Sequence, residues 1–238
     1  MPLITRNLIL EALDELSIGN FAARPFDCSF ELLASPPSQK RLIMIGFNGS
    51  LADAKHTNAG AVLAGYKQPA FSNIAHGVEG GWGSRTLARR LTDLPNKLGF
   101  DWRTTVYTNA LLLCSSNAAS IRKVAQQSTA ANLESLTRIS MDFFERVTMR
   151  IAEPELIIAY SNGLGSPSAA KILWERFGDG EPLDHVNSSS YGATFGFTAT
   201  IGSRKVPVVG IRHMSRFVPN TDAIQLAWER QKAKRMTP

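Results

Sequence analysis

Cysteine, histidine and long apolar runs are scarce in this sequence. The 238 residues include two cysteines and four histidines. With only Cys28 and Cys114, one chain cannot supply the four thiolates of a structural zinc or iron–sulfur site, and such low cysteine use fits a reducing compartment. No apolar run approaches the roughly 20 residues that a membrane helix needs. These absences exclude a four-cysteine cluster within one chain and a protein that crosses a membrane.

Metal-ligand and leader patterns are also missing. No spacing of His, Cys and Asp suggests a metal site, so we expect a site without metal or cofactor. The opening MPLITRNLILEALDEL carries Glu11, Asp14 and Glu15 and has no small-residue cleavage site, which makes it a poor signal peptide. We expect a cytoplasmic protein with one domain over residues 1–238, because this length suits one sizeable core. The sequence does not indicate an oligomeric state.

The net charge of +6 is concentrated at one end of the chain. Residues 203–238 hold eight lysines and arginines against two acids, and the rest of the chain balances. Basic clusters bind polyanions through counterion release. A solvated tail helix would explain the same pattern, and charge alone does not decide between the two.

Strands and helices alternate along the chain. Four apolar runs rich in Ile, Val, Leu and Tyr, with little alternation, predict buried parallel strands. They cover residues 41–47, 104–113, 155–160 and 206–212. The sequence therefore predicts a three-layer α/β/α sandwich with a central four-stranded, mainly parallel sheet. The segment 185–195 fits a turn or a hairpin that leads to an added edge strand.

Helical signals lie between these runs. Apolar residues recur on one face over 130–151 and stop at Pro154. In SPSAAKILWERFG, Ser166 can cap a helix that Gly178 ends. A helix that starts near Ser84 should end or kink at Pro95, and the last helix should cover 221–235.

The carboxyl ends of parallel strands share one edge, and ligands bind beyond that edge. The segments GFNGS, TNALLLCSS, AYSNGLGS and IRHMSRF therefore should meet. In the first, Gly46 and Gly49 allow a sharp turn and a close approach of a ligand, and Asn48 offers donors and an acceptor. GFNGS lacks the lysine of a phosphate-binding P-loop and is not the G-x-S-x-G of a nucleophile elbow. Taken alone, it reads as a structural turn.

The order of the motifs carries more information than any one of them. A first strand that ends in GFNGS, a second with TN at 108–109, and a last that ends in HMS at 213–215 resemble the uracil-DNA glycosylase superfamily. The resemblance covers about residues 41–217. It implies a glycosylase-like fold and hydrolysis of the N-glycosidic bond of uracil, or of another deaminated or damaged base, in single- or double-stranded DNA.

The resemblance also implies roles for individual residues. Asn48 would position the attacking water, and His213 would stabilise negative charge on the departing base. The base pocket would include Asn109, which reads the pyrimidine edge, with Gly46, Phe47 and Phe71, the last as the stacking aromatic. The phosphate contacts would be Gly49, Ser50, Ser215 and Arg216. Met214, Arg216 or Phe217 would then stand where the family pushes a side chain into the duplex.

The chemistry supports these residue types independently of the family. Cleavage leaves negative charge on the base, so a donor such as His213 aimed at a base oxygen lowers the barrier. The Asn109 amide can pair with both N3–H and O4 of uracil, whereas cytosine reverses those polarities and leaves buried groups unpaired. Flipping a base costs a few kcal/mol and requires phosphate contacts.

Two positions depart from the family pattern. Gly49 and Met214 stand where prolines are usual, so we expect both loops to be less preorganised. This departure keeps two alternatives open: a glycosylase-like nucleic-acid-binding protein without turnover, and a hydrolase of small nucleosides on the same scaffold.

Overall fold

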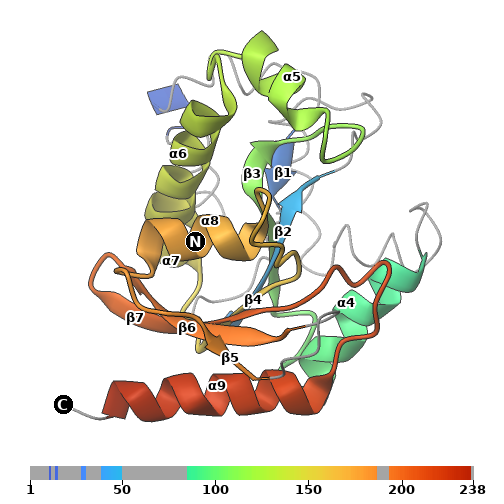
Figure 1. Cartoon of the computed structure of the whole chain (residues 1–238), viewed down its shortest axis with the longest axis vertical. Helices are drawn as coiled ribbons and strands as arrows, with labels where there is room; N and C mark the ends of the chain where they lie inside the picture. The colour runs from blue at the N-terminus through green and yellow to red at the C-terminus, as the bar shows by residue number, and fades with distance from the viewer. Residues whose placement is uncertain are drawn as a thin grey trace.

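The computed structural model describes residues 11, 14–15, 28–30, 39–49, 85–186 and 193–236. These residues form an α/β structure with one mixed sheet and helices packed against it (Figure 1). The predicted α/β class is confirmed. Among the described residues, no helix is long and apolar enough to cross a membrane.

The sheet has seven strands in the order β1-β3-β2-β4-β7-β6-β5. The four inner strands β3, β2, β4 and β7 are mutually parallel, and they are the four strands that the sequence predicts. The sheet is wider than predicted because β1, β6 and β5 add to it in antiparallel orientation. The strands are β1 Cys28–Phe30, β2 Leu42–Asn48, β3 Val106–Leu113, β4 Leu156–Ala159, β5 Asp184–His185, β6 Phe195–Ile201 and β7 Arg204–Gly210.

The inner strands are mostly apolar because both of their faces are covered. In β2, Ile43 and Ile45 belong to one buried cluster, whereas Leu42 and Met44 belong to a second cluster on the other face. Successive side chains of a strand point to opposite faces, so a run without alternation fills two cores at once. This explains why these runs could be recognised as buried strands.

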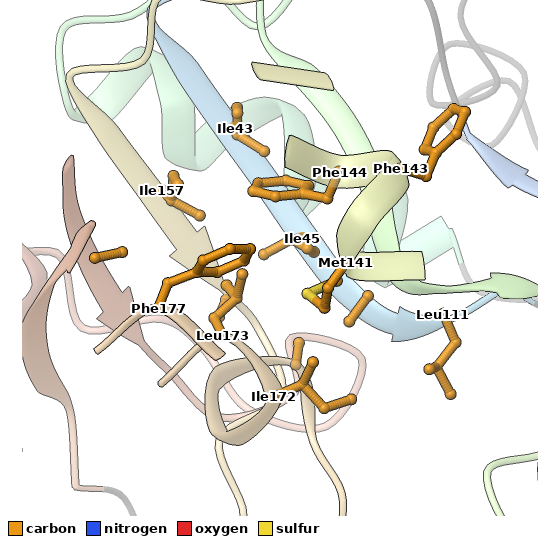
Figure 2. Packing of buried hydrophobic residues seen from close by; sticks show 14 of the residues in the cluster. Ile43, Ile45, Leu111, Met141, Phe143, Phe144, Ile157, Ile172, Leu173 and Phe177 are labelled. Carbon is orange, nitrogen blue, oxygen red and sulfur yellow. The ribbon is translucent and has the colours of Figure 1, made fainter. Parts of the chain in front are cut away.

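Helices cover both faces of the sheet. The first buried cluster contains residues of α5, α6, η4, α7 and α8, and the second contains residues of α4 and α9. Figure 1 shows α6 and α8 on one side of the sheet and α9 on the other, and Figure 2 shows the first cluster, where Phe144 and Phe177 pack over Ile45 and Ile157. The helices are α4 Arg85–Lys97, α5 Ile121–Gln127, α6 Leu133–Phe143, η4 Phe144–Thr148, α7 Met149–Ile151, α8 Ala169–Phe177 and α9 Thr221–Met236.

The helix boundaries follow the sequence patterns only in part. α4 continues through Pro95 to Lys97, where an end or a kink was expected, and α5 was not predicted. The segment predicted as one helix over 130–151 contains a π-helical turn, η4, between α6 and α7. Ser168, not Ser166, caps α8, since its side chain accepts a hydrogen bond from the Lys171 amide at 3.2 Å. Gly178 ends α8 as predicted.

Gly210 should tolerate no side chain. It pairs with Phe195 across β6 and β7, and a Cβ at this position would lie 2.6 Å from two Phe195 ring atoms and 3.1 Å from the Ala170 Cβ. We expect Gly210→Ala to lower the free energy of unfolding in urea by about 1–3 kcal/mol, because the ring is fully buried and must move. Gly165→Ala is the control, since a Cβ there has no neighbour within 4 Å. Equal urea midpoints for the two variants would contradict this packing.

Candidate active site

The two proposed catalytic residues lie at the same edge of the sheet. Ile45, Ala159 and Gly210 pair in one row across β2, β4 and β7. Asn48 and His213 each follow that row by three residues in the sequence, in the direction of the carboxyl ends of the strands. The topology therefore brings the first and last motifs to one edge, with β4 between them.

Gly46 and Asn109 are register partners on β2 and β3, and their contact is close. A Cβ on Gly46 would lie 2.4 Å from Asn109 Oδ1 and 2.7 Å from Tyr160 Oη. The Asn109 carbonyl oxygen and the Tyr160 hydroxyl thus occupy the space where a side chain of residue 46 would be. Gly46 is required here for this approach rather than for a turn.

Tyr160 connects this point to the histidine. Its side chain is 8% exposed, and its ring lies edge-on to the His213 ring, with the centroids 5.8 Å apart and the planes at 64°. The sequence analysis did not identify Tyr160. The available signal was a tyrosine at the end of the otherwise aliphatic run ELIIAY, where a buried hydroxyl needs a polar neighbour.

The protonation of His213 follows from its contacts with Ser215. The backbone N–H of Ser215 donates to Nδ1 at 3.2 Å, and Ser215 Oγ lies 2.7 Å from the same nitrogen. A backbone N–H can only donate, so Nδ1 is the acceptor and the neutral ring carries its proton on Nε2. No described residue hydrogen-bonds Nε2. The hydroxyl of Ser215 is engaged with the imidazole, which makes this residue an orienting group for His213 rather than a free phosphate donor.

Two effects keep His213 neutral. His213 is an exposed residue, but the partial burial of its ring lowers the pKa of the imidazole, and the nearby Arg216 guanidinium lowers it further. At neutral pH the ring is therefore an uncharged donor through Nε2–H. A neutral imidazole with a hydrogen on Nε2 can stabilise an anion by donating a hydrogen bond to it, and the proton stays on the ring.

The loop that carries His213 is anchored although Met214 stands where the resemblance would place a proline. Met214 is fully buried in the cluster between the sheet and α4 and α9, and its carbonyl accepts a hydrogen bond from Arg90 Nη1 at 2.6 Å. The backbone amides of Arg216 and Phe217 both donate to the His213 carbonyl, at 3.1 and 3.2 Å. These contacts hold the loop where we expected Met214 to loosen it.

The same contacts narrow the choice of a side chain that could enter a duplex. Met214 is wrong for this role because it points into the core. Phe217 is half-buried, and the Arg212 guanidinium stacks over its ring. Arg216 is exposed, and so is the neighbouring Val218, which is 74% exposed and which the sequence analysis did not consider.

Asn48 is fixed by the end of β3. Its Nδ2 donates to the Gly49 carbonyl at 2.9 Å and to Ser115 Oγ at 2.7 Å, and Ser115 Oγ donates to the Asn117 carbonyl at 2.7 Å. The Gly49 carbonyl also accepts the Ser115 amide at 3.0 Å. Both amide hydrogens thus face inward, and Oδ1, which no described residue donates to, is the end that could accept a hydrogen bond from water. Ser115 lies in the TNALLLCSS segment, but the sequence did not single it out.

Phe47 does not join this group. It belongs to the buried cluster with Ile43 and Ile45, on the face of β2 opposite to Gly46. There it lines a cavity of about 250 Å³ between the starts of α5, α6 and α8, together with Arg122. The predicted residues Phe71 and Ser50 lie outside the described residues.

Three of the C-terminal cations are engaged with other parts of the protein. Arg204 stands at the opposite end of β7, where its Nη1 donates to the carbonyls of Met149 and Ala152 at 3.0 Å. Arg230 and Lys234 pair with Asp184 on the edge strand β5, at 3.1 and 3.5 Å. These three cations therefore have partners within the protein.

Within the described part of the chain, no three His, Cys, Asp or Glu side chains come together in a way that could hold a metal ion. The groups at the edge are instead two amides, an imidazole, a phenol and two hydroxyls. They can donate and accept hydrogen bonds to a polar planar ligand.

The pKa of His213 offers a direct test. We expect NMR titration to give a value below the ordinary 6.5 and Arg216→Gln to raise it, since removing a nearby cation favours the protonated ring. Because the folded state binds fewer protons there, stability should fall as the pH drops through 6.5. The control is Arg103→Gln, another exposed arginine, which stacks on Trp102. An unchanged pKa in Arg216→Gln would refute this electrostatic account.

No protein-family model matches this chain, and a search of curated proteins finds no significant relative.

Proposed function

We propose that this protein hydrolyses the N-glycosidic bond of uracil, or of another deaminated or damaged base, in DNA, in the manner of uracil-DNA glycosylases. The single observation that carries the proposal is the neutral His213 with its proton on Nε2, at the same strand edge as the Asn48 and Asn109 amides. The four parallel strands and the order of the three motifs support a glycosylase-like fold.

Each group has a defined task in this reaction. As the bond between sugar and base breaks, the electron pair moves to the base, and the Nε2–H of His213 donates to the base oxygen that gains charge. Asn109 recognises the base edge, and a mismatched edge would leave its amide unpaired. Asn48 Oδ1 accepts a hydrogen bond from the water that attacks the sugar. Ser215 keeps the imidazole in the required tautomer.

Two exposed or half-exposed cations flank the histidine and suit a DNA backbone. Arg216 is exposed, and Arg212 stacks on Phe217 beside it. Their charge would hold the distorted strand while a base is flipped. Arg90 is already used to fix the Met214 carbonyl, so it contributes to position more than to binding.

A second candidate function is DNA binding without turnover. An amide cannot remove a proton from water, and Asn48 has no carboxylate among its described hydrogen-bond partners. Incubation with uracil-containing single- and double-stranded DNA, followed by alkali, separates the candidates. Binding without strand scission would favour the binder, and cleavage of free nucleosides without DNA binding would favour a nucleoside hydrolase.

His213→Ala should abolish most turnover. We expect kcat on uracil-containing DNA to fall about 100- to 1000-fold, the usual effect of losing one donor to a developing anion, with DNA affinity changed much less. His185→Ala is the matched control, because His185 is an exposed histidine on the edge strand β5 that contacts Phe195. Parallel loss of affinity and kcat in His213→Ala would show that the residue is part of the scaffold.

Salt dependence locates the DNA contact. We expect Arg216→Gln to weaken binding for all sequences and to reduce the slope of log K against log salt by about one, because one phosphate contact is lost. Lys234→Gln, which removes a cation paired with Asp184, should leave the slope unchanged. The reverse result would place the DNA on α9 instead of the His213 loop.

A further inference from the structure

Tyr160 lies at this edge, but the motifs give it no role. Its side chain lies beside Asn109 above Gly46 and contacts the His213 ring. It directly follows β4, the strand between β2 and β7. Its backbone N–H donates to the Ile45 carbonyl at 3.0 Å, so its Cα continues the pairing of β4 with β2. Its side chain belongs to the buried cluster on the face covered by α4 and α9.

The hydroxyl end of Tyr160 reaches the base-recognition group. Its Oη and Asn109 Oδ1 approach the same point above Gly46, at 2.7 and 2.4 Å from where a Cβ would stand. Tyr160 arrives from β4 and Asn109 from β3, on opposite sides of β2. Neither side chain could occupy this place if residue 46 carried a methyl group.

The ring of Tyr160 reaches the charge-stabilising group. The two ring centroids of Tyr160 and His213 are 5.8 Å apart, and the rings meet at 64°, an edge-to-face arrangement. The contact covers one side of the imidazole, while Ser215 holds its Nδ1. The tyrosine therefore limits the rotation of His213.

We propose that Tyr160 is a positioning residue of this site, which fixes the Asn109 amide through its hydroxyl and the His213 imidazole through its ring. The catalytic part of this inference rests on the proposed glycosylase function, whereas the positioning itself does not. Since Tyr160 and Asn109 close the space directly above Gly46, the base lies further out along the strands, towards Asn48 and His213.

The two ends of the side chain can be tested separately. Tyr160→Phe keeps the ring and removes the hydroxyl, and Tyr160→Leu removes both. Tyr107→Phe is the control, because Tyr107 is a buried tyrosine on the same face whose hydroxyl donates to the Leu91 and Trp102 carbonyls, at 3.0 and 3.2 Å. It loses a buried hydroxyl whose acceptors are the Leu91 and Trp102 carbonyls rather than groups of the site.

Two NMR measurements need no turnover. In Tyr160→Phe, we expect the side-chain amide signals of Asn109 to shift while the pKa of His213 stays as in the parent protein. In Tyr160→Leu, the pKa of His213 should rise towards its ordinary value, because the aromatic ring no longer packs against the imidazole. Tyr107→Phe should change neither. If both Tyr160 variants leave the Asn109 signals and the His213 pKa as in the control, the positioning role is refuted, whether or not the protein cleaves DNA.

Activity assays on uracil-containing DNA then connect position to catalysis. Tyr160→Phe should lose about tenfold in kcat/KM, mainly through KM, and should discriminate less well between uracil and cytosine. Tyr160→Leu should also lose kcat, because the donor is misplaced. Absence of cleavage by the parent protein would refute the proposed function, while the NMR results would still decide the role of Tyr160. Parent-like kcat/KM in both variants would refute the catalytic part alone.

Discussion

The arrangement of the edge depends on the missing side chain of Gly46. Because β2 lies between β3 and β4, its neighbours can meet above it only where nothing projects from its backbone. Asn109 and Tyr160 use this opening, and Tyr160 extends the contact to His213 on the far side of β4. Side chains from β3, from the residue after β4 and from the loop after β7 thus lie side by side across this edge.

Gly49 and Met214 stand where prolines were expected, and noncovalent contacts hold these two loops in place of the proline rings. A proline restricts the unfolded chain as well as the folded one, whereas hydrogen bonds and burial act only in the folded state. Gly49 is tied to Ser115 through its carbonyl, and Met214 is held by its buried side chain and by Arg90. The order of these loops therefore depends on the integrity of the sheet and of α4.

The sequence predicts the scaffold better than the site. The four inner strands are recognisable because two covered faces require continuous apolar runs, and Gly178 and the 221–235 pattern mark helix ends that the structure contains. The strands β1 and β5 are too short to leave a pattern. The roles of Tyr160, Ser115 and Arg90 depend on contacts between distant parts of the chain. Ser115 lies 67 residues from its partner Asn48, and Arg90 lies 124 residues from Met214, so no local spacing encodes these roles.

The sheet also sets a width for what can bind at its edge. One strand separates β2 from β7, and adjacent strands are about 4.8 Å apart, so the strands that carry Asn48 and lead to His213 run about 10 Å from each other. Hydrogen-bonded strands keep this spacing whatever side chains they carry. The distance between the two strands is therefore set by the backbone and stays the same when Asn48 or His213 is replaced.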